Sequence, residues 1–97
     1  MYAVIFRAEI GEIDETYSEM ASRARDLALS QYGCVDLTVV TDGNQEVAIS
    51  YWTTQEQIRA WINDPIHQKA QELGRSKWYK SYSVQLVEIL REYKQNT

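Results

Sequence analysis

Residues 53–82 read TTQEQIRAWINDPIHQKAQELGRSKWYKSY. This stretch holds two of the three tryptophans, the single histidine and the single proline of the chain. It predicts a short helix, a second helix that begins at Pro65, and the entry to a final strand. Proline suits the first helical position, and Asp64 can cap the helix in front of it. We expect this segment to form one wall of any small-molecule cavity.

The other segments are predicted from their periodicity. Alternation over residues 2–10 predicts a strand, and an apolar stripe at three- and four-residue steps predicts a helix from about residue 14 to about residue 32. Two strand-like runs, residues 34–41 and 45–52, flank an Asp-Gly loop, which is typical of a hairpin. Residues 79–93 predict a long final strand.

Some details of these elements remain open at this level. Residues 84–93 also fit a helical three-residue step, although we favour a strand because YKSYSV is poor helix material and the topology needs a partner strand. Each of the first two helices has more than one possible cap. The candidates are Asp14 or the Thr16–Glu19 pair for the first helix, and the Thr53–Glu56 or Thr54–Gln57 pair for the second.

The order strand, helix, strand, strand, helix, strand predicts a ferredoxin-like α+β fold over residues 1–97, as one domain. Its four-stranded antiparallel sheet should carry helices on one face. The other face is apolar in places, so we expect a second copy of the chain to cover it in a homodimer.

Composition excludes several classes of protein. The net charge of −4 argues against a nucleic-acid partner, because phosphate binding needs a basic surface. No apolar run approaches the roughly 20 residues of a membrane helix, and no secretion signal is recognisable, so we expect a cytoplasmic protein. Cys34 is the single cysteine, which excludes an intrachain disulfide or a multi-cysteine metal site. We expect it to be a small buried hydrophobic residue.

The run IRAWINDPIHQKAQELGR, followed by WYKSYSVQLVEI, resembles the antibiotic biosynthesis monooxygenase domain family. The most specific part is Trp61, then Asp64-Pro65-Ile66-His67, then Gly74-Arg75. The resemblance covers nearly the whole chain. It implies a dimeric α+β barrel in which each subunit has one cavity between its sheet and its helices.

Members of this family differ in activity. Some oxygenate phenolic polyketides or quinols with molecular oxygen and no cofactor, some degrade haem, and many have no assigned reaction. The cofactor-free members use a helix tryptophan, matched by Trp61, with a polar aromatic residue near the position of His67. The haem-degrading members pair that tryptophan with an asparagine and a haem-ligating histidine, where this chain has Arg7 and Gln71.

We therefore expect a cofactor-independent monooxygenase that acts on a small aromatic or quinol-type compound. The alternatives are a non-enzymatic ligand-binding or stress-response dimer, and a haem-binding or haem-degrading protein. Oxygenation requires a phenolate, so a base and a group that stabilises an oxyanion are needed. We predict these catalytic groups to be His67 and Arg7, with no metal. The predicted substrate-binding residues are Trp61, Trp52, Trp78, Tyr82 and Arg75.

For each of these residues a structural role is the competing interpretation. The tryptophans and Tyr82 could be core or dimer contacts, and His67 could be an exposed polar residue near a helix start. Arg7 could pair with a carboxylate across the dimer, and Arg75 could be a charge at a helix end.

Overall fold

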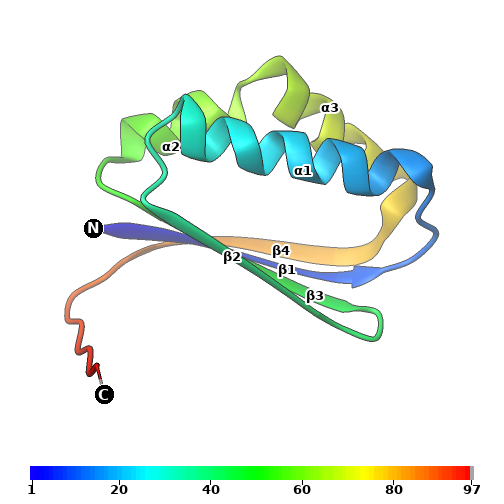
Figure 1. The fold of residues 1–97 in the computed structure, drawn as a ribbon. Coiled ribbons are helices and arrows are strands. Elements are labelled where there is room, and N and C mark those ends of the chain that lie inside the picture. The colour runs from blue at the N-terminus through cyan, green and yellow to red at the C-terminus, as the bar shows by residue number, and fades with distance from the viewer. Residues whose placement is uncertain (97) are drawn as a thin grey trace.

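The computed structural model describes residues 1–96, and these form a sheet covered on one face by helices (Figure 1). No helix in this part of the chain has the length and apolar character needed to cross a membrane. The elements are β1 (Tyr2–Ile10), α1 (Glu15–Ser30), β2 (Asp36–Asp42), β3 (Gln45–Trp52), α2 (Gln55–Ile62), α3 (Pro65–Leu73), a π-helical turn η1 (Gly74–Trp78) and β4 (Tyr79–Glu88).

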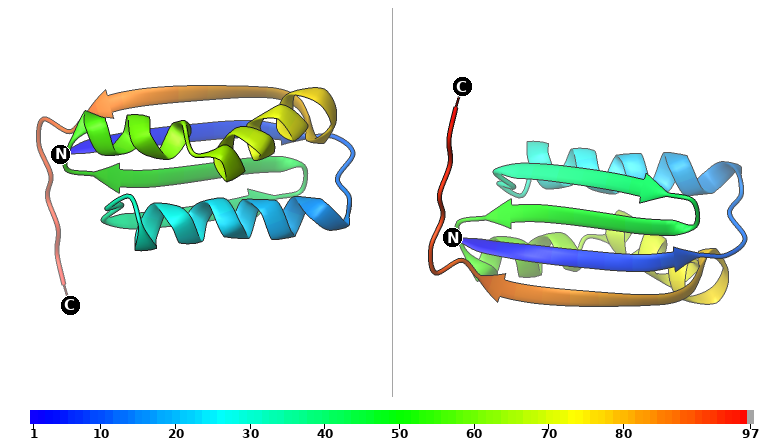
Figure 2. Two further views of the ribbon diagram at one scale, coloured as in Figure 1. Left: turned by 90° about the horizontal axis from the view of Figure 1, so that it is seen from above. Right: turned by 90° about the horizontal axis from the view of Figure 1, so that it is seen from below.

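The sheet has the strand order β2-β3-β1-β4, and every pair is antiparallel. The predicted ferredoxin-like α+β fold is therefore confirmed. In the central strand, Ile5 pairs with Ile49 on one side and Gln85 on the other. Figure 2 shows α1 along the β2 side of the sheet and α2 and α3 along the β1 side. The edge strand β4 is consequently only partly covered.

The structure settles both open helix caps. Oδ1 of Asp14 accepts a hydrogen bond from the backbone N–H of Thr16 (3.1 Å), so Asp14 begins α1. Thr54 and Gln57 form the capping box of α2, in which each side chain accepts a hydrogen bond from the other residue's backbone N–H. Both caps satisfy backbone donors that a helix start leaves without intrahelical partners.

Residues from the sheet, α1 and α2 form the core between the two layers. Cys34 is buried there, as predicted. The central cluster consists of Val4, Ala28, Cys34, Trp52, Ile58 and Trp61.

The final strand is shorter than predicted. It ends at Glu88 rather than residue 93, and residues 84–93 do not form a helix. The last residue pair between β1 and β4 joins Tyr2 to Glu88, because β1 begins at residue 2 and offers no longer partner. Beyond it the chain leaves the body (Figure 1), and Leu90 and Tyr93 are 90% and 85% exposed.

The face of the sheet opposite the helices carries apolar side chains that the chain itself leaves without cover. The period-two alternation of the strands places them on one face. Its half-buried members are Ile5, Val47, Ile49, Tyr51 and Val87, and the exposed Val40 lies beside them.

Candidate functional site

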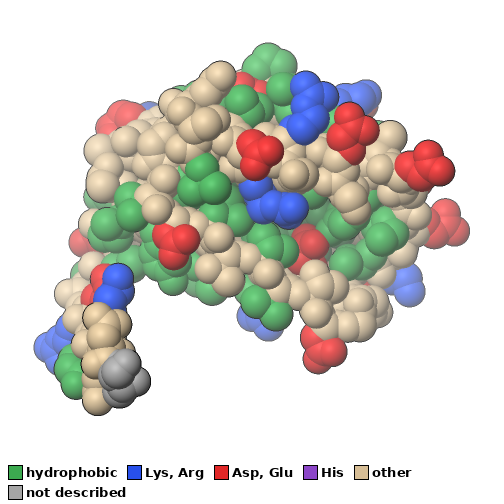
Figure 3. Space-filling model, in the orientation of Figure 1, with side chains coloured by type: hydrophobic (Ala, Val, Ile, Leu, Met, Phe, Trp, Pro, Cys, Tyr) green, Lys and Arg blue, Asp and Glu red, His purple; other side chains and the backbone are tan. Residues whose placement is uncertain are grey.

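A cavity of about 370 Å³ lies between the sheet and the helix layer. Its volume falls within the range of small-molecule sites, and most of its lining is apolar or aromatic. In the orientation of Figure 3, apolar side chains reach the surface along the seam between the two layers. The lining residues are Val4, Phe6, Ala21, Ala24, Arg25, Val39, Glu46, Ala48, Trp61, Ile62, His67, Ala70, Gln71, Arg75, Trp78, Tyr79, Tyr82 and Val84.

Three aromatic rings form a row at the α2–α3 end of the cavity. The ring centroids of Trp52 and Trp61 are 5.2 Å apart, and those of Trp61 and His67 are 4.0 Å apart with an angle of 25° between the planes. Trp61 is fixed by its own hydrogen bond, which Nε1 donates to the carbonyl oxygen of Ala24 (2.9 Å). The imidazole of His67 thus stacks on an indole ring whose orientation is fixed.

The environment of His67 favours the neutral ring with a free Nε2. Nδ1 lies 3.1 Å from the carbonyl oxygen of Trp61, and because a carbonyl oxygen only accepts, Nδ1 carries the proton. Burial lowers the pKa of His67, outweighing the opposing effects of this carbonyl and of the Asp64 carboxylate. Nε2 of His67 makes no hydrogen bond. Every fully buried side-chain nitrogen or oxygen in residues 1–96 has a hydrogen-bond partner, so Nε2 is not fully buried and remains accessible.

The chain holds His67 in place by fixing the start of α3. Asp64 caps this helix by accepting a hydrogen bond from the backbone N–H of Ile66 (2.8 Å), and Pro65 occupies the first helical position, as predicted. The hydroxyl of Tyr32, which follows α1, also donates to Asp64 (2.6 Å). His67 therefore lies in the first turn of a helix whose start is anchored to the segment that follows α1.

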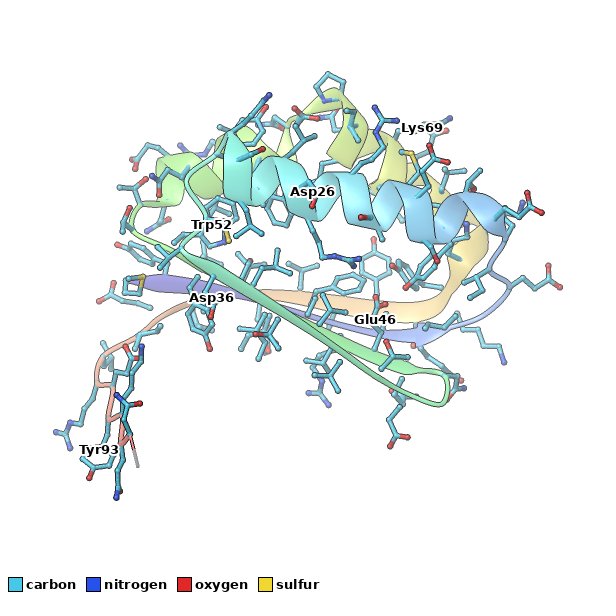
Figure 4. All side chains as sticks on the ribbon, viewed as in Figure 1. Asp26, Asp36, Glu46, Trp52, Lys69 and Tyr93 are labelled. Atoms are coloured by element: carbon cyan, nitrogen blue, oxygen red, sulfur yellow. The ribbon has the colours of Figure 1, made fainter. Side chains whose placement is uncertain are left out.

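The other end of the cavity is polar. Glu46, on β3, is only 9% exposed and lies on the helix side of the sheet (Figure 4). Its Oε1 accepts a hydrogen bond from the hydroxyl of Tyr17 on α1, and its Oε2 lies 3.5 Å from the hydroxyl of Tyr79. Burial raises the pKa of Tyr79 to about 12 and raises that of Tyr17 further, so both phenols stay protonated and act as donors.

Aromatic side chains and two cations continue the lining from this polar end. The rings of Phe6, Tyr79 and Tyr82 are in mutual contact, and the centroid of Phe6 lies 5.3 Å from that of Tyr79 and 6.1 Å from that of Tyr82. Arg25 and Arg75 also line the cavity. Tyr82 and Val84 line it while remaining 45% and 54% exposed, so the cavity opens beside the uncovered edge of β4.

The structure brings five of the seven predicted site residues to one cavity and leaves two outside it. Trp61, His67, Trp78, Tyr82 and Arg75 line the cavity. Trp52 is fully buried behind Trp61, with Nε1 donating to Ser50 (2.8 Å), so it supports the wall without forming it. Arg7 lies on the opposite face of the sheet, exposed and paired in register with Val47 and Ser83.

Glu46, Tyr17, Tyr79 and Arg25 line or support the site but were not predicted. For Glu46 a signal exists in the sequence, because it shares the strand parity of Ala48 and Trp52 and is the charged member of that face. The other three carry no comparable signal. Within residues 1–96 no group of three His, Cys, Asp or Glu side chains is arranged to hold a metal ion.

The βαββαβ arrangement is shared with solved structures described as antibiotic biosynthesis monooxygenases, which confirms the resemblance at the level of the fold. SnoaB, described as a cofactor-independent oxygenase from Streptomyces nogalater, superposes with a TM-score of 0.79 at 15% identity over 97% of both chains. Rv0793 from Mycobacterium tuberculosis gives 0.81 at 12% identity, over 96% of this chain and 98% of that one. A protein described as antibiotic biosynthesis monooxygenase gives 0.69 at 16%, over 94% and 100%.

No family model matches the sequence. The uncharacterized protein YqjZ of Bacillus subtilis (strain 168) is 36% identical over 99 residues, covering 99% of this chain and 87% of that protein. The chain belongs to the same family as YqjZ.

Proposed function

We propose that the protein is a cofactor-independent oxygenase that acts on a small phenol or quinol-type aromatic compound. The observation that carries the proposal is the pairing of Trp61 with a neutral His67 whose Nε2 is free. A flat ring packs well against aromatic walls. An unprotonated Nε2 beside that ring is placed to accept a phenolic proton.

In this mechanism the protein supplies placement and a base, while the substrate supplies the electrons. His67 takes the phenolic proton, and the phenolate donates electron density to oxygen. One ring C–H carbon forms a new bond to one atom of O2, and the ring and its hydroxyl groups together lose two hydrogens. The second oxygen atom leaves with these two hydrogens as water. The mostly apolar cavity keeps bulk water from the anion, which strengthens the polar contacts made to it.

Oxygen uptake by the purified protein in the presence of a naphthoquinol tests this proposal. We expect a rate above spontaneous autoxidation, and mass spectrometry should find one atom from isotopically labelled oxygen gas in the product. The matched variant is His67→Asn, whose side-chain amide can still donate to the Trp61 carbonyl but offers no base at the Nε2 position. Its kcat should fall by about 10²–10⁴. An unchanged kcat in a folded His67→Asn protein contradicts the mechanism.

A non-enzymatic ligand-binding protein is the second candidate, because the same apolar cavity could hold a ring without reacting with it. Quenching of tryptophan fluorescence by the quinol, without oxygen uptake beyond the blank, would identify this function. Haem is the third candidate. It is less favoured because Gln71, which stands where the haem-degrading members carry the ligating histidine, has an amide that donates to the Ile62 carbonyl (3.2 Å). A shift of the Soret band on haem titration would support it.

We further propose that the chain acts as a homodimer through the open face of the sheet. The half-buried Ile5, Ile49 and Val87 lie on this face, which the chain's own helices leave uncovered. A contiguous apolar surface of this kind is typical of an interface. Arg7 lies on the same face, and the dimer gives it a place at the subunit contact rather than in the cavity.

A further inference from the structure

We propose that Glu46 is a second recognition point in the cavity, which selects ligands that carry a hydroxyl or amino group at the end remote from His67. This inference deepens the proposed function by naming the substrate class, but binding alone can test it. Glu46 belongs to the polar end of the cavity, whereas His67 and Trp61 form the other end. A ligand that spans the cavity therefore meets one acceptor at each end.

The carboxylate of Glu46 has unused capacity to accept hydrogen bonds. Its Oε1 is held by the hydroxyl of Tyr17, but the contact of Oε2 with the hydroxyl of Tyr79 is long, at 3.5 Å. An ionised carboxylate offers about four lone-pair sites, so these two donors leave it incompletely satisfied. A buried charge is costly unless it is paired and fully hydrogen-bonded. A ligand hydroxyl or amino group that donates to Oε2 would supply the missing hydrogen bond.

The cations that line the cavity do not neutralise this carboxylate. Within residues 1–96 no salt bridge joins Glu46 to Arg25 or Arg75. Arg75 is exposed and Arg25 is half-buried, so water screens both guanidinium groups more than it screens Glu46. The most deeply buried charge in the cavity wall is therefore negative, which favours a ligand that donates over one that carries an anion.

The wall between the two ends is apolar and suits a flat ring system. Phe6 and Tyr82 are stacked, with an angle of 25° between their planes, and Val84 follows them towards the opening. The cavity therefore offers an acceptor, an aromatic surface and a second acceptor in sequence. The matching ligand is a fused aromatic compound with donors at both ends.

Four probes that differ only at one end of naphthol test the inference. They are naphthol, a naphthalenediol with hydroxyls at opposite ends, the corresponding aminonaphthol, and the corresponding hydroxynaphthoate. Binding is measured by quenching of tryptophan fluorescence without oxygen, so that no turnover occurs. We expect the diol and the aminonaphthol to bind about tenfold more tightly than naphthol, and the hydroxynaphthoate to bind most weakly.

The matched variant is Glu46→Gln, which can still accept from Tyr17 but has lost the negative charge. It should bind all four probes within about threefold of one another. Equal affinities in the unaltered protein, tightest binding of the hydroxynaphthoate, or no binding of any probe would each overturn the inference. These results come from the unaltered chain, so they decide the matter even if Glu46→Gln fails to fold.

Binding and turnover can fail separately. The expected ranking of probes without oxygen uptake would refute the oxygenase while leaving the role of Glu46 intact. Oxygen uptake with naphthoquinol but equal probe affinities would support the oxygenase and refute the role of Glu46.

Discussion

The hydroxyl of Tyr32 donates a hydrogen bond to Oδ2 of Asp64 across 2.6 Å, while Oδ1 of the same carboxylate caps α3 at Ile66. One side chain thus ties the end of the first helical segment to the start of the helix that carries His67. The hydrogen bond from Tyr32 is the main reason that the pKa of Asp64 is lowered. The position of the candidate base therefore depends on a residue that does not line the cavity.

Replacing Tyr32 by Phe should loosen this connection without removing the ring. We expect the melting temperature to fall by a few degrees and the affinity for naphthoquinol to decrease several-fold, because Asp64 keeps its cap but loses its tie to α1. Circular dichroism and fluorescence quenching measure the two effects. The matched control is Tyr2→Phe, since the hydroxyl of Tyr2 makes no hydrogen bond within residues 1–96. Equal behaviour of the two variants would show that the Tyr32–Asp64 bond does not position His67.

The sequence predicts the elements of this fold well because most of them follow local rules. Periodicity places the strands and helices, and Asp64 with Pro65 marks the start of α3. The six-residue step from Trp61 to His67 across that cap is also visible, but their stacking depends on the angle between α2 and α3. The end of β4 could not be predicted, because it is set by the first residue of its partner β1.

The cavity is less predictable, because its polar end is assembled from distant parts of the chain. Glu46 meets Tyr17 across 29 residues of sequence, and no local pattern links them. Alternation in β1 separates Arg7 from Phe6, but both faces of that strand begin apolar, so the sequence does not tell which face the helices cover. This ambiguity is the reason that Arg7 is predicted in the cavity although it lies on the opposite face of the sheet.

Substituting Gly74 by Ala tests the close contact that shapes the wall. A Cβ atom at this position would lie 2.8 Å from Cε2 of Tyr79, against a ring that is packed on Phe6. We expect a loss of about 1–3 kcal/mol in the free energy of unfolding, measured by urea denaturation. Gly11→Ala is the control, because its new Cβ would meet the flexible side chain of Lys80 at 3.2 Å. A smaller loss at position 74 than at position 11 would contradict the contact.

The titration of His67 predicts how stability depends on pH. Burial lowers its pKa in the folded chain, whereas the unfolded chain keeps a value near 6.5 and so binds the proton at higher pH. Stability should therefore fall as the pH drops through about 6.5 towards the folded-state value, and this contribution should level off below it. Urea midpoints between about pH 7 and pH 5 measure the slope. His67→Asn should remove most of it, since the carboxylates titrate mainly at lower pH; an equal slope in both proteins would contradict the assignment.

The open face of the sheet yields a test of the proposed dimer. Ile49 lies near the middle of this face, next to Ile5 in β1 and Thr38 in β2, so a lysine there would place a charge in the apolar contact. We expect the unaltered protein to sediment as a dimer and Ile49→Lys to raise its dissociation constant at least about a hundredfold, because an unpaired buried charge costs several kcal/mol. The control is Glu56→Lys, an exposed position in the first turn of α2. A monomeric unaltered protein, or an Ile49→Lys variant that dimerises as strongly as the unaltered protein, would show that this face is not the interface. Arg7 would then be a solvent-exposed residue without a role at a subunit contact.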